Sequence, residues 1–170
     1  MKANVYARNM KVLRRRMPVL AKAMEMIPPS GCEYIVEEAK DGSMTLAIKR
    51  DDKVYQVHSK YNPQREATQQ IENSKLINPK LLLVLGLGLG YHLRACLEQL
   101  KEKNHFIVLI EKDVDALRVA LETVDMTDLL ESEKIRWVVG VPEEEGYAVL
   151  NDMIKNAGIA LQLFLKTLQV

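Results

Sequence analysis

The chain has 170 residues, of which 48% are hydrophobic and 28% charged, and its formal net charge is +1. These values are typical of a globular protein with a buried core, and the near-neutral balance gives no sign of binding to nucleic acid or to an anionic membrane. No stretch reaches the roughly 18 apolar residues of a membrane span, and no apolar segment of a secretory signal follows the basic N-terminus. We therefore expect a cytoplasmic protein.

Residues 1–29 are the first predicted unit, a basic helical arm. Apolar residues recur there at steps near three and four, which predicts one apolar stripe. The stripe consists of Val5, Met10, Leu13, Met17, Leu20, Ala21 and Met24. Pro18 should kink the helix or begin a second one, because proline lacks the N–H group that a helix interior needs. With seven basic residues against one acid up to residue 27, we expect the arm to pack on another surface, in this chain or in a second copy.

Residues 30–79 are the second predicted unit, a small antiparallel β-meander followed by a helix. The three expected strands cover residues 33–39, 44–49 and 53–58. Asp41-Gly42 is a typical hairpin signal between the first two strands. Asn62 suits the N-cap of the following helix and Pro63 its first position, and Asn78-Pro79 should end it.

Residues 80–170 are the third predicted unit, in which apolar strands alternate with amphipathic helices. The expected strands cover residues 81–85, 106–110 and 135–139, and the expected helices cover residues 91–103, 114–124 and 143–156. Residues 160–165 fit a fourth strand or a buried helix. Continuous apolar strands joined by helices indicate a parallel sheet covered on both faces. We predict an α/β fold with a Rossmann-like parallel sheet after the arm and the meander, with residues 30–170 in one compact unit.

A glycine-rich turn joins the first of these strands to its helix. Gly86, Gly88 and Gly90 allow positive φ angles and let a ligand approach the backbone, next to a helix N-terminus that favours anions. Tyr91 and His92 lie in the first turn of that helix, where they would face such a ligand. The alternatives are a turn that binds nothing and a His92 that caps the local backbone.

The identity of the ligand is narrowed by the residues around the turn. Tyr91 stands where the dinucleotide fingerprint has its third glycine, which disfavours NAD and FAD. The spacing resembles the glycine motif of S-adenosylmethionine-dependent methyltransferases, except that Val84 replaces their acid. Glu111 ends the second strand, where a carboxylate can accept from both ribose hydroxyls, while Asp113 suits the cap of the next helix. The cofactor stays unidentified, and we expect a nucleoside-type ligand such as S-adenosylmethionine or a nucleotide sugar.

A polar segment before the second unit's helix supplies the predicted substrate-binding residues. These are His58, Ser59, Tyr61, Asn62 and Arg65. The segment follows a strand, so it can line a cleft beside the nucleotide fold. Its alternative role is local capping by Asn62, Pro63 and Glu66.

Catalytic groups are not evident in the sequence. An open α/β sheet places its catalytic groups after its strands, and no acid, base or metal cluster follows the third or fourth strand. Cys32 and Cys96 fit neither a disulfide framework nor a metal-binding spacing. We predict no catalytic and no metal residue, and a domain that does not catalyse a reaction on its own; if it is an enzyme, we expect a transferase.

Three segments together resemble the motility-associated factor family. They are H-S-x-Y-N-P-x-x-E-A at residues 58–67, L-G-L-G-L-G-Y-H at residues 85–92 and I-E-K-D at residues 110–113. Members are flagellin glycosyltransferases that transfer nonulosonic acids to serine or threonine. The resemblance covers residues 30–150 and the family's N-terminal region. The central catalytic domain carries a G-x-G-P-S motif, which this chain lacks.

The resemblance implies a nucleotide- or substrate-binding accessory domain that lacks the glycosyl-transfer domain. Its partners would be flagellin or a glycosyltransferase domain. Two alternatives stay open. The first is a small-molecule methyltransferase that binds its cofactor through Gly86, Gly88, Gly90 and Glu111. The second is a non-catalytic interaction module whose basic arm docks a partner or, through the same helix, a second copy.

Overall fold

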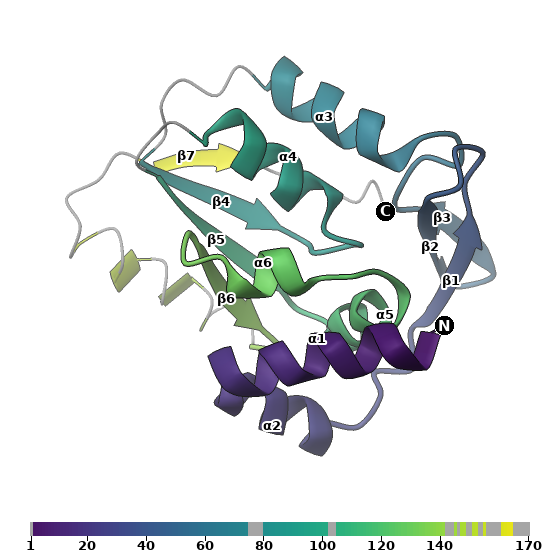
Figure 1. Cartoon of the computed structure of the whole chain (residues 1–170), viewed down its shortest axis with the longest axis horizontal. Coiled ribbons are helices and arrows are strands. Elements are labelled where there is room, and N and C mark those ends of the chain that lie inside the picture. The colour runs from purple at the N-terminus through teal and green to yellow at the C-terminus, as the bar shows by residue number, and fades with distance from the viewer. Residues whose placement is uncertain are drawn as a thin grey trace.

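The structure, a computed structural model, describes residues 2–74, 80–101, 105–141, 145, 147, 148, 151, 152, 155 and 161–164. It contains a three-stranded antiparallel sheet and a four-stranded parallel sheet with helices packed around them (Figure 1). The predicted α/β class and the Rossmann-like arrangement are confirmed.

The parallel sheet has the strand order β6-β5-β4-β7. Its strands are β4 (Leu81–Leu85), β5 (Phe106–Glu111), β6 (Ile135–Val139) and β7 (Leu161–Phe164). The chain moves outward from β4 to β6 and then returns to place β7 on the other side of β4, with Leu81 paired to Leu161. Residues 160–165, which fitted either a strand or a buried helix, therefore contribute a strand. The reversal of strand order beside β4 is the point where open α/β sheets bind their ligands, at the carboxyl ends of the strands.

Three described helices follow these strands: α4 (Tyr91–Gln99), α5 (Val114–Thr123) and α6 (Thr127–Glu131). Leu93 and Cys96 of α4 and Leu117 of α5 are fully buried, as the apolar spacing predicts. The expected helix over residues 91–103 ends at Gln99, and residues 102–104 lie outside the described part. The sequence did not predict α6, because five residues are too few for a visible period. Of the expected helix over residues 143–156, positions 145, 147, 148, 151, 152 and 155 are helical and the others lie outside the described residues.

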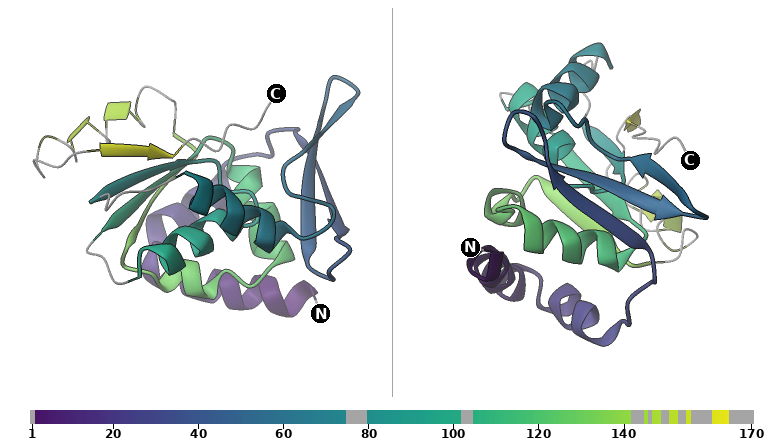
Figure 2. Two further views of the ribbon diagram at one scale, coloured as in Figure 1. Left: turned by 90° about the horizontal axis from the view of Figure 1, so that it is seen from above. Right: turned by 90° about the vertical axis from the view of Figure 1, so that its right-hand side faces the viewer.

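The meander consists of β1 (Glu33–Glu38), β2 (Met44–Arg50) and β3 (Lys53–Gln56), followed by α3 (Pro63–Asn73). The three strands pair in sequence order, as predicted. β3 is shorter than expected, because the N–H groups of Val57 and His58 both turn to the carbonyl of Leu46. The predicted end of α3 at Asn78-Pro79 lies outside the described residues. The meander stands across the carboxyl ends of the parallel strands (Figures 1 and 2).

The arm forms two helices, α1 (Lys2–Arg16) and α2 (Pro18–Met26), with the break before Pro18 that the sequence predicts. Met10 and Leu13 are buried, and α1 runs along α5 and α6 (Figure 1). The arm therefore packs on its own chain, which is one of the two expected surfaces.

Asn9 fixes the position of α1 on the junction between α5 and α6. Its buried amide donates to the carbonyls of Leu121 and Val124, each at 2.8 Å, and its carbonyl oxygen accepts from the Met126 N–H at 2.9 Å. These backbone groups lie where one helix ends and the next begins, so they have no helical partner of their own. Local sequence patterns do not single out this asparagine, because its partners lie more than one hundred positions away.

The arginines of the arm face acids of the same chain. Arg8 pairs with Asp125 at 3.4 Å, Arg14 with Glu25 at 3.2 Å, and Arg15 and Arg16 both pair with Glu131. Exposed pairs of this kind stabilise a protein by roughly 0–1 kcal/mol each. The apolar contacts and Asn9 therefore hold the arm, and the ion pairs orient it.

Candidate functional site

The glycine turn has the backbone geometry that the sequence predicts. Gly86, Gly88 and Gly90 have φ angles of 86°, 52° and 78°, all in the left-handed region that glycine adopts without steric cost. This geometry turns the chain sharply from the end of β4 into α4.

Four N–H groups of this turn are hydrogen-bonded within the chain. The Leu87 N–H donates to Glu111 Oε2 at 2.8 Å, and the Leu89 N–H donates to His58 Nε2 at the same distance. The N–H groups of Gly86 and Gly90 donate to the carbonyls of Ile110 and Leu87. In a phosphate-binding turn such groups point at the ligand. Here a carboxylate and an imidazole from other parts of the chain accept two of these hydrogen bonds.

The Glu111 side chain, at the end of β5, also stabilises the glycine turn. Besides the Leu87 N–H, its carboxylate accepts from the Asp113 N–H at 2.9 Å. Burial raises the pKa of Glu111 above its usual value, and the two N–H donors oppose that shift. Asp113 caps α5 by accepting from the Asp115 N–H, as predicted. A ribose would therefore share Glu111 with two backbone donors.

His58 is packed against the turn and is not part of an open cleft. The residue is 1% exposed, and a Cβ atom on Gly88 would lie 2.5 Å from His58 Nε2. The imidazole meets the Tyr91 ring edge-on and stacks on the His92 ring. The distances between ring centres are 5.0 Å to Tyr91 and 5.6 Å to His92. Because Nε2 accepts from Leu89, the neutral ring carries its proton on Nδ1.

The cavity beside the turn has a volume of about 40 Å³. Gly86, Gly88 and Glu111 line one side of it. Side chains of the meander close the other side, namely Tyr34, Leu46, Ile48 and Val57. Pockets for small molecules and cofactors usually measure roughly 300–1,000 Å³. The structure brings the predicted cofactor residues together, but the meander fills the space where a nucleoside would lie.

Tyr91 and His92, the other predicted cofactor residues, are buried at the start of α4. The Tyr91 hydroxyl donates to the Met44 carbonyl at 2.7 Å, and burial raises its pKa. A ring nitrogen of His92 lies 3.0 Å from Gln70 Oε1 of α3. Both side chains join α4 to neighbouring elements.

The other predicted substrate-binding residues mostly organise the start of α3. Asn62 accepts from the Arg65 N–H at 2.7 Å, and the Ser59 N–H donates to Glu66 at 2.9 Å. Tyr61 is 65% exposed, and the Lys40 ammonium lies 4.4 Å from the centre of its ring. The capping interpretation of this segment is confirmed for Asn62.

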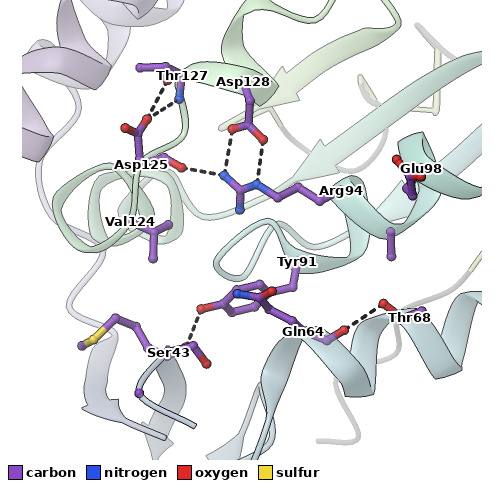
Figure 3. A pocket seen from close by; sticks show the side chains of 13 residues that line it. Ser43, Gln64, Thr68, Tyr91, Arg94, Glu98, Val124, Asp125, Thr127 and Asp128 are labelled. Carbon is purple, nitrogen blue, oxygen red and sulfur yellow. Dashed lines mark hydrogen bonds and ion pairs between the residues drawn. The ribbon is translucent and has the colours of Figure 1, made fainter. Parts of the chain in front are cut away.

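A second, larger cavity of about 690 Å³ has Tyr91 in its wall (Figure 3). The meander turn, α3, α4 and the segment from α5 to α6 form its walls; the lining residues are Gly42, Ser43, Met44, Gln64, Thr68, Tyr91, Arg94, Ala95, Glu98, Val124, Asp125, Thr127 and Asp128. We call it the cleft. Sequence reasoning missed it because four separate segments supply its walls. The sequence did contain one sign of this wall. Its α4 residues, Tyr91, Arg94, Ala95 and Glu98, are spaced so that they lie on one face of the helix.

Arg94 holds one wall of the cleft in place. Its guanidinium binds both carboxylate oxygens of Asp128, at 2.7 and 2.8 Å, and also donates to the carbonyls of Asp125 and Leu89. Such a fork-shaped pair is geometrically specific. Asp125 in turn accepts from the hydroxyl and the N–H of Thr127, which lowers the pKa of its carboxyl group. Figure 3 shows this network facing Gln64 and Thr68 across the cleft.

Two further properties concern the described residues alone. None of their helices is both long and apolar enough to cross a membrane. No group of three or more histidine, cysteine, aspartate or glutamate side chains among them is arranged to hold a metal ion.

Comparison with known proteins agrees with the resemblance drawn from the three sequence segments. Residues 44–158 match the family described as the glycosyltransferase Maf N-terminal domain. An uncharacterized protein of Treponema pallidum (strain Nichols) is 29% identical over 170 aligned residues, which cover 94% of this chain and 54% of that protein. The chain thus spans about half the length of this relative. The crystal structure of MnmC2 from Aquifex aeolicus is a distant likeness, with 20% identity and a TM-score of 0.36 over 81% of this chain and 55% of that one. The chain belongs to the family of glycosyltransferase Maf N-terminal domains.

Proposed function

We propose that this chain is a substrate-binding accessory domain of a glycosyltransferase, and that its ligand binds in the cleft and not at the glycine turn. The family assignment supports the link to glycosyl transfer. The observation that carries the choice of site is the difference between the two cavities, about 690 Å³ against about 40 Å³. Glycosyl transfer itself would belong to a further part of a longer protein, since the relative is nearly twice as long.

The same geometry weighs against the methyltransferase alternative. S-adenosylmethionine would need the space beside Gly86 and Gly88, which the meander occupies. It would also compete with Glu111 for the Leu87 N–H and with His58 for the Leu89 N–H. Val84, in the place of the methyltransferase acid, is fully buried.

The docking alternative loses its main support in a similar way. It relied on the basic charge of the arm, whereas four of its seven basic residues, Arg8, Arg14, Arg15 and Arg16, pair with acids of the same chain. A partner would therefore have to displace several ion pairs before it reached those guanidinium groups.

The test fills the cleft and leaves the turn untouched. Thr68→Trp places an indole in the cleft, while Gln69→Trp adds the same side chain at the next, exposed position of α3. Amide resonances of the 15N-labelled chain are followed by NMR during titration with cytidine monophosphate, a cytidine-monophosphate sugar, S-adenosylmethionine and a serine/threonine-rich peptide.

We expect at least one of these compounds to shift the resonances of Arg94, Ala95 and Glu98. Thr68→Trp should abolish the shifts, and Gln69→Trp should leave them unchanged. Shifts confined to residues 86–90, or insensitive to Thr68→Trp, would overturn the assignment of the cleft.

A further inference from the structure

A third cavity, of about 490 Å³, lies where the break in the arm meets the start of β6. Its walls come from the end of α1, from α6 and the turn after it, and from the first residues of β5 and β6. It shares no lining residue with the cleft or with the cavity beside the glycine turn. We call it the Trp137 cavity. Its volume, and its mixture of apolar, aromatic and a few charged side chains, are those of a small-molecule site.

The apolar part of the wall presents flat and polarisable groups. Phe106, at the start of β5, is 50% exposed, and Trp137 of β6 and Met17 at the break in the arm line the same cavity. The pairing of β5 with β6 sets Trp137 beside Leu109, which is fully buried and supports it. Aromatic rings stack on one another, and methionine sulfur contacts ring edges. A planar ring system therefore matches this wall better than an aliphatic chain does.

The charged groups of the cavity favour an anion. Arg16 lies 3.9 Å from the Glu133 carboxylate and 3.9 Å from that of Glu131, so the acid in the wall already faces a cation. Arg136 also lines the cavity, and it forms no ion pair or hydrogen bond with the residues that the structure describes. The surplus charge of the wall is thus the positive charge of Arg136. A guanidinium group binds carboxylate and phosphate oxygens in a fork and also stacks on ring faces.

The Trp137 indole adds a hydrogen-bond donor that is not in use. Its Nε1 atom is buried and has no acceptor among the residues that the structure describes. Buried indole N–H groups usually have a partner, because an unpaired buried donor costs stability. Indole and guanidinium groups donate and do not accept. A ligand oxygen that carries negative charge therefore suits both Trp137 and Arg136.

We propose that the Trp137 cavity binds a small molecule that combines a planar ring system with a carboxylate or phosphate group. The ring lies against Phe106 and Trp137, and the anionic group pairs with Arg136. The inference is independent of the proposed function, because the Trp137 cavity and the cleft have different walls. It gives the domain a second ligand, held next to the arm and not between α3 and α4.

The test uses the indole N–H as its own reporter. Trp137 is the one tryptophan of the sequence, so the 15N-labelled chain has a single indole N–H resonance, which is followed by NMR. The chain is titrated with 2-naphthoate and 2-naphthyl phosphate, which carry the same rings and different anions. 2-Naphthamide has the rings without the charge, and cyclohexylacetate has the charge without a flat ring.

Two matched variants test the role of the cation. Arg136→Gln removes the guanidinium from the cavity. Arg50→Gln makes the same change at another exposed arginine, which lines none of the three cavities. Arg136→Gln should weaken the binding of the naphthyl anion about tenfold, and Arg50→Gln should leave it unchanged.

We expect at least one naphthyl anion to shift the indole resonance, and the tighter of the two identifies the anionic group. 2-Naphthamide and cyclohexylacetate should bind at least about tenfold more weakly. The inference would be overturned by an unshifted indole resonance with both anions, by equal binding of 2-naphthamide, or by equal affinities of the two variants. Shifts confined to Arg94 and Glu98 would place the compound in the cleft and would overturn it as well.

Discussion

The glycine turn and the cleft meet at the start of α4, yet one is filled and the other is open. At the turn, side chains from the meander and from β5 accept the hydrogen bonds that a ligand would accept. In the cleft, Arg94, Asp125 and Asp128 bind one another and leave a space of about 690 Å³ in front of them. A glycine motif therefore specifies a backbone turn, whereas the neighbouring elements decide whether that turn has room for a ligand.

The largest effect is expected where the turn is tightest. Gly88→Val should destabilise the chain by about 2–5 kcal/mol, because the residue has a positive φ and its Cβ atom would overlap the buried His58 ring. Urea unfolding followed by circular dichroism measures the change. The matched control is Gly86→Val, whose Cβ atom would meet nothing within 4 Å and which should therefore cost only the backbone strain. Equal losses for both variants would show that His58 does not close the turn.

Removing the imidazole tests the same contact from the other side. His58→Ala deletes a fully buried ring and leaves the Leu89 N–H without its acceptor. We expect a loss of about 2–4 kcal/mol in the free energy of unfolding. Calorimetric titration with adenosine monophosphate gives a second measurement. Binding by this variant, but not by the unmodified chain, would show that His58 occupies a site that is otherwise able to bind a nucleotide.

A smaller effect is expected at Asn9, which supports the wall of the cleft from behind. Asn9→Ala leaves the carbonyls of Leu121 and Val124 and the N–H of Met126 without their partner. We expect a loss of about 2 kcal/mol, together with NMR shifts at Asp125 and Asp128. Asn4→Ala, at an exposed position of the same helix, is the control and should change neither. An unchanged Asp128 resonance in Asn9→Ala would separate the arm from the cleft.

The smallest effect is a pH dependence that originates at Glu111. Burial raises its pKa in the folded state above the ordinary value of 4.5, so the folded chain binds this proton more tightly than the unfolded chain does. The resulting stabilisation is complete below that value and is lost as the pH rises through the raised pKa. Glu111→Gln cannot titrate. The unfolding free energy of the unmodified chain minus that of the variant should therefore fall as the pH rises from about 4 to neutrality. A difference that grows with pH would contradict the raised pKa.

Much of the fold follows from local sequence. The apolar runs at Leu81–Leu85 and residues 106–110 predict buried parallel strands, and the structure pairs them. Asn62 and Pro63 predict the start of α3, and Pro18 predicts the break in the arm. Each of these features depends on residues within a few positions of one another, so one sequence is enough to find them.

The site was less predictable because its decisive contacts join distant segments. His58 and Leu89 are 31 positions apart, and neither residue indicates that the other is its partner. The residues chosen for binding, Gly86, Gly88 and Glu111, do lie together, but their pattern gave no sign that Leu46 and Val57 would fill the space beside them. The cleft depends on four segments whose arrangement is set by tertiary packing.

β7 has a consequence for where the chain can be shortened. The match to the family ends at residue 158, three positions before β7 begins. A chain cut at that boundary would turn β4, an unbroken run of leucine and valine, into the edge of the sheet. Exposed apolar edges pair with other molecules and lead to aggregation. By pairing with β4, the four residues of β7 thus keep the most apolar of the described strands from becoming a template for intermolecular β-pairing.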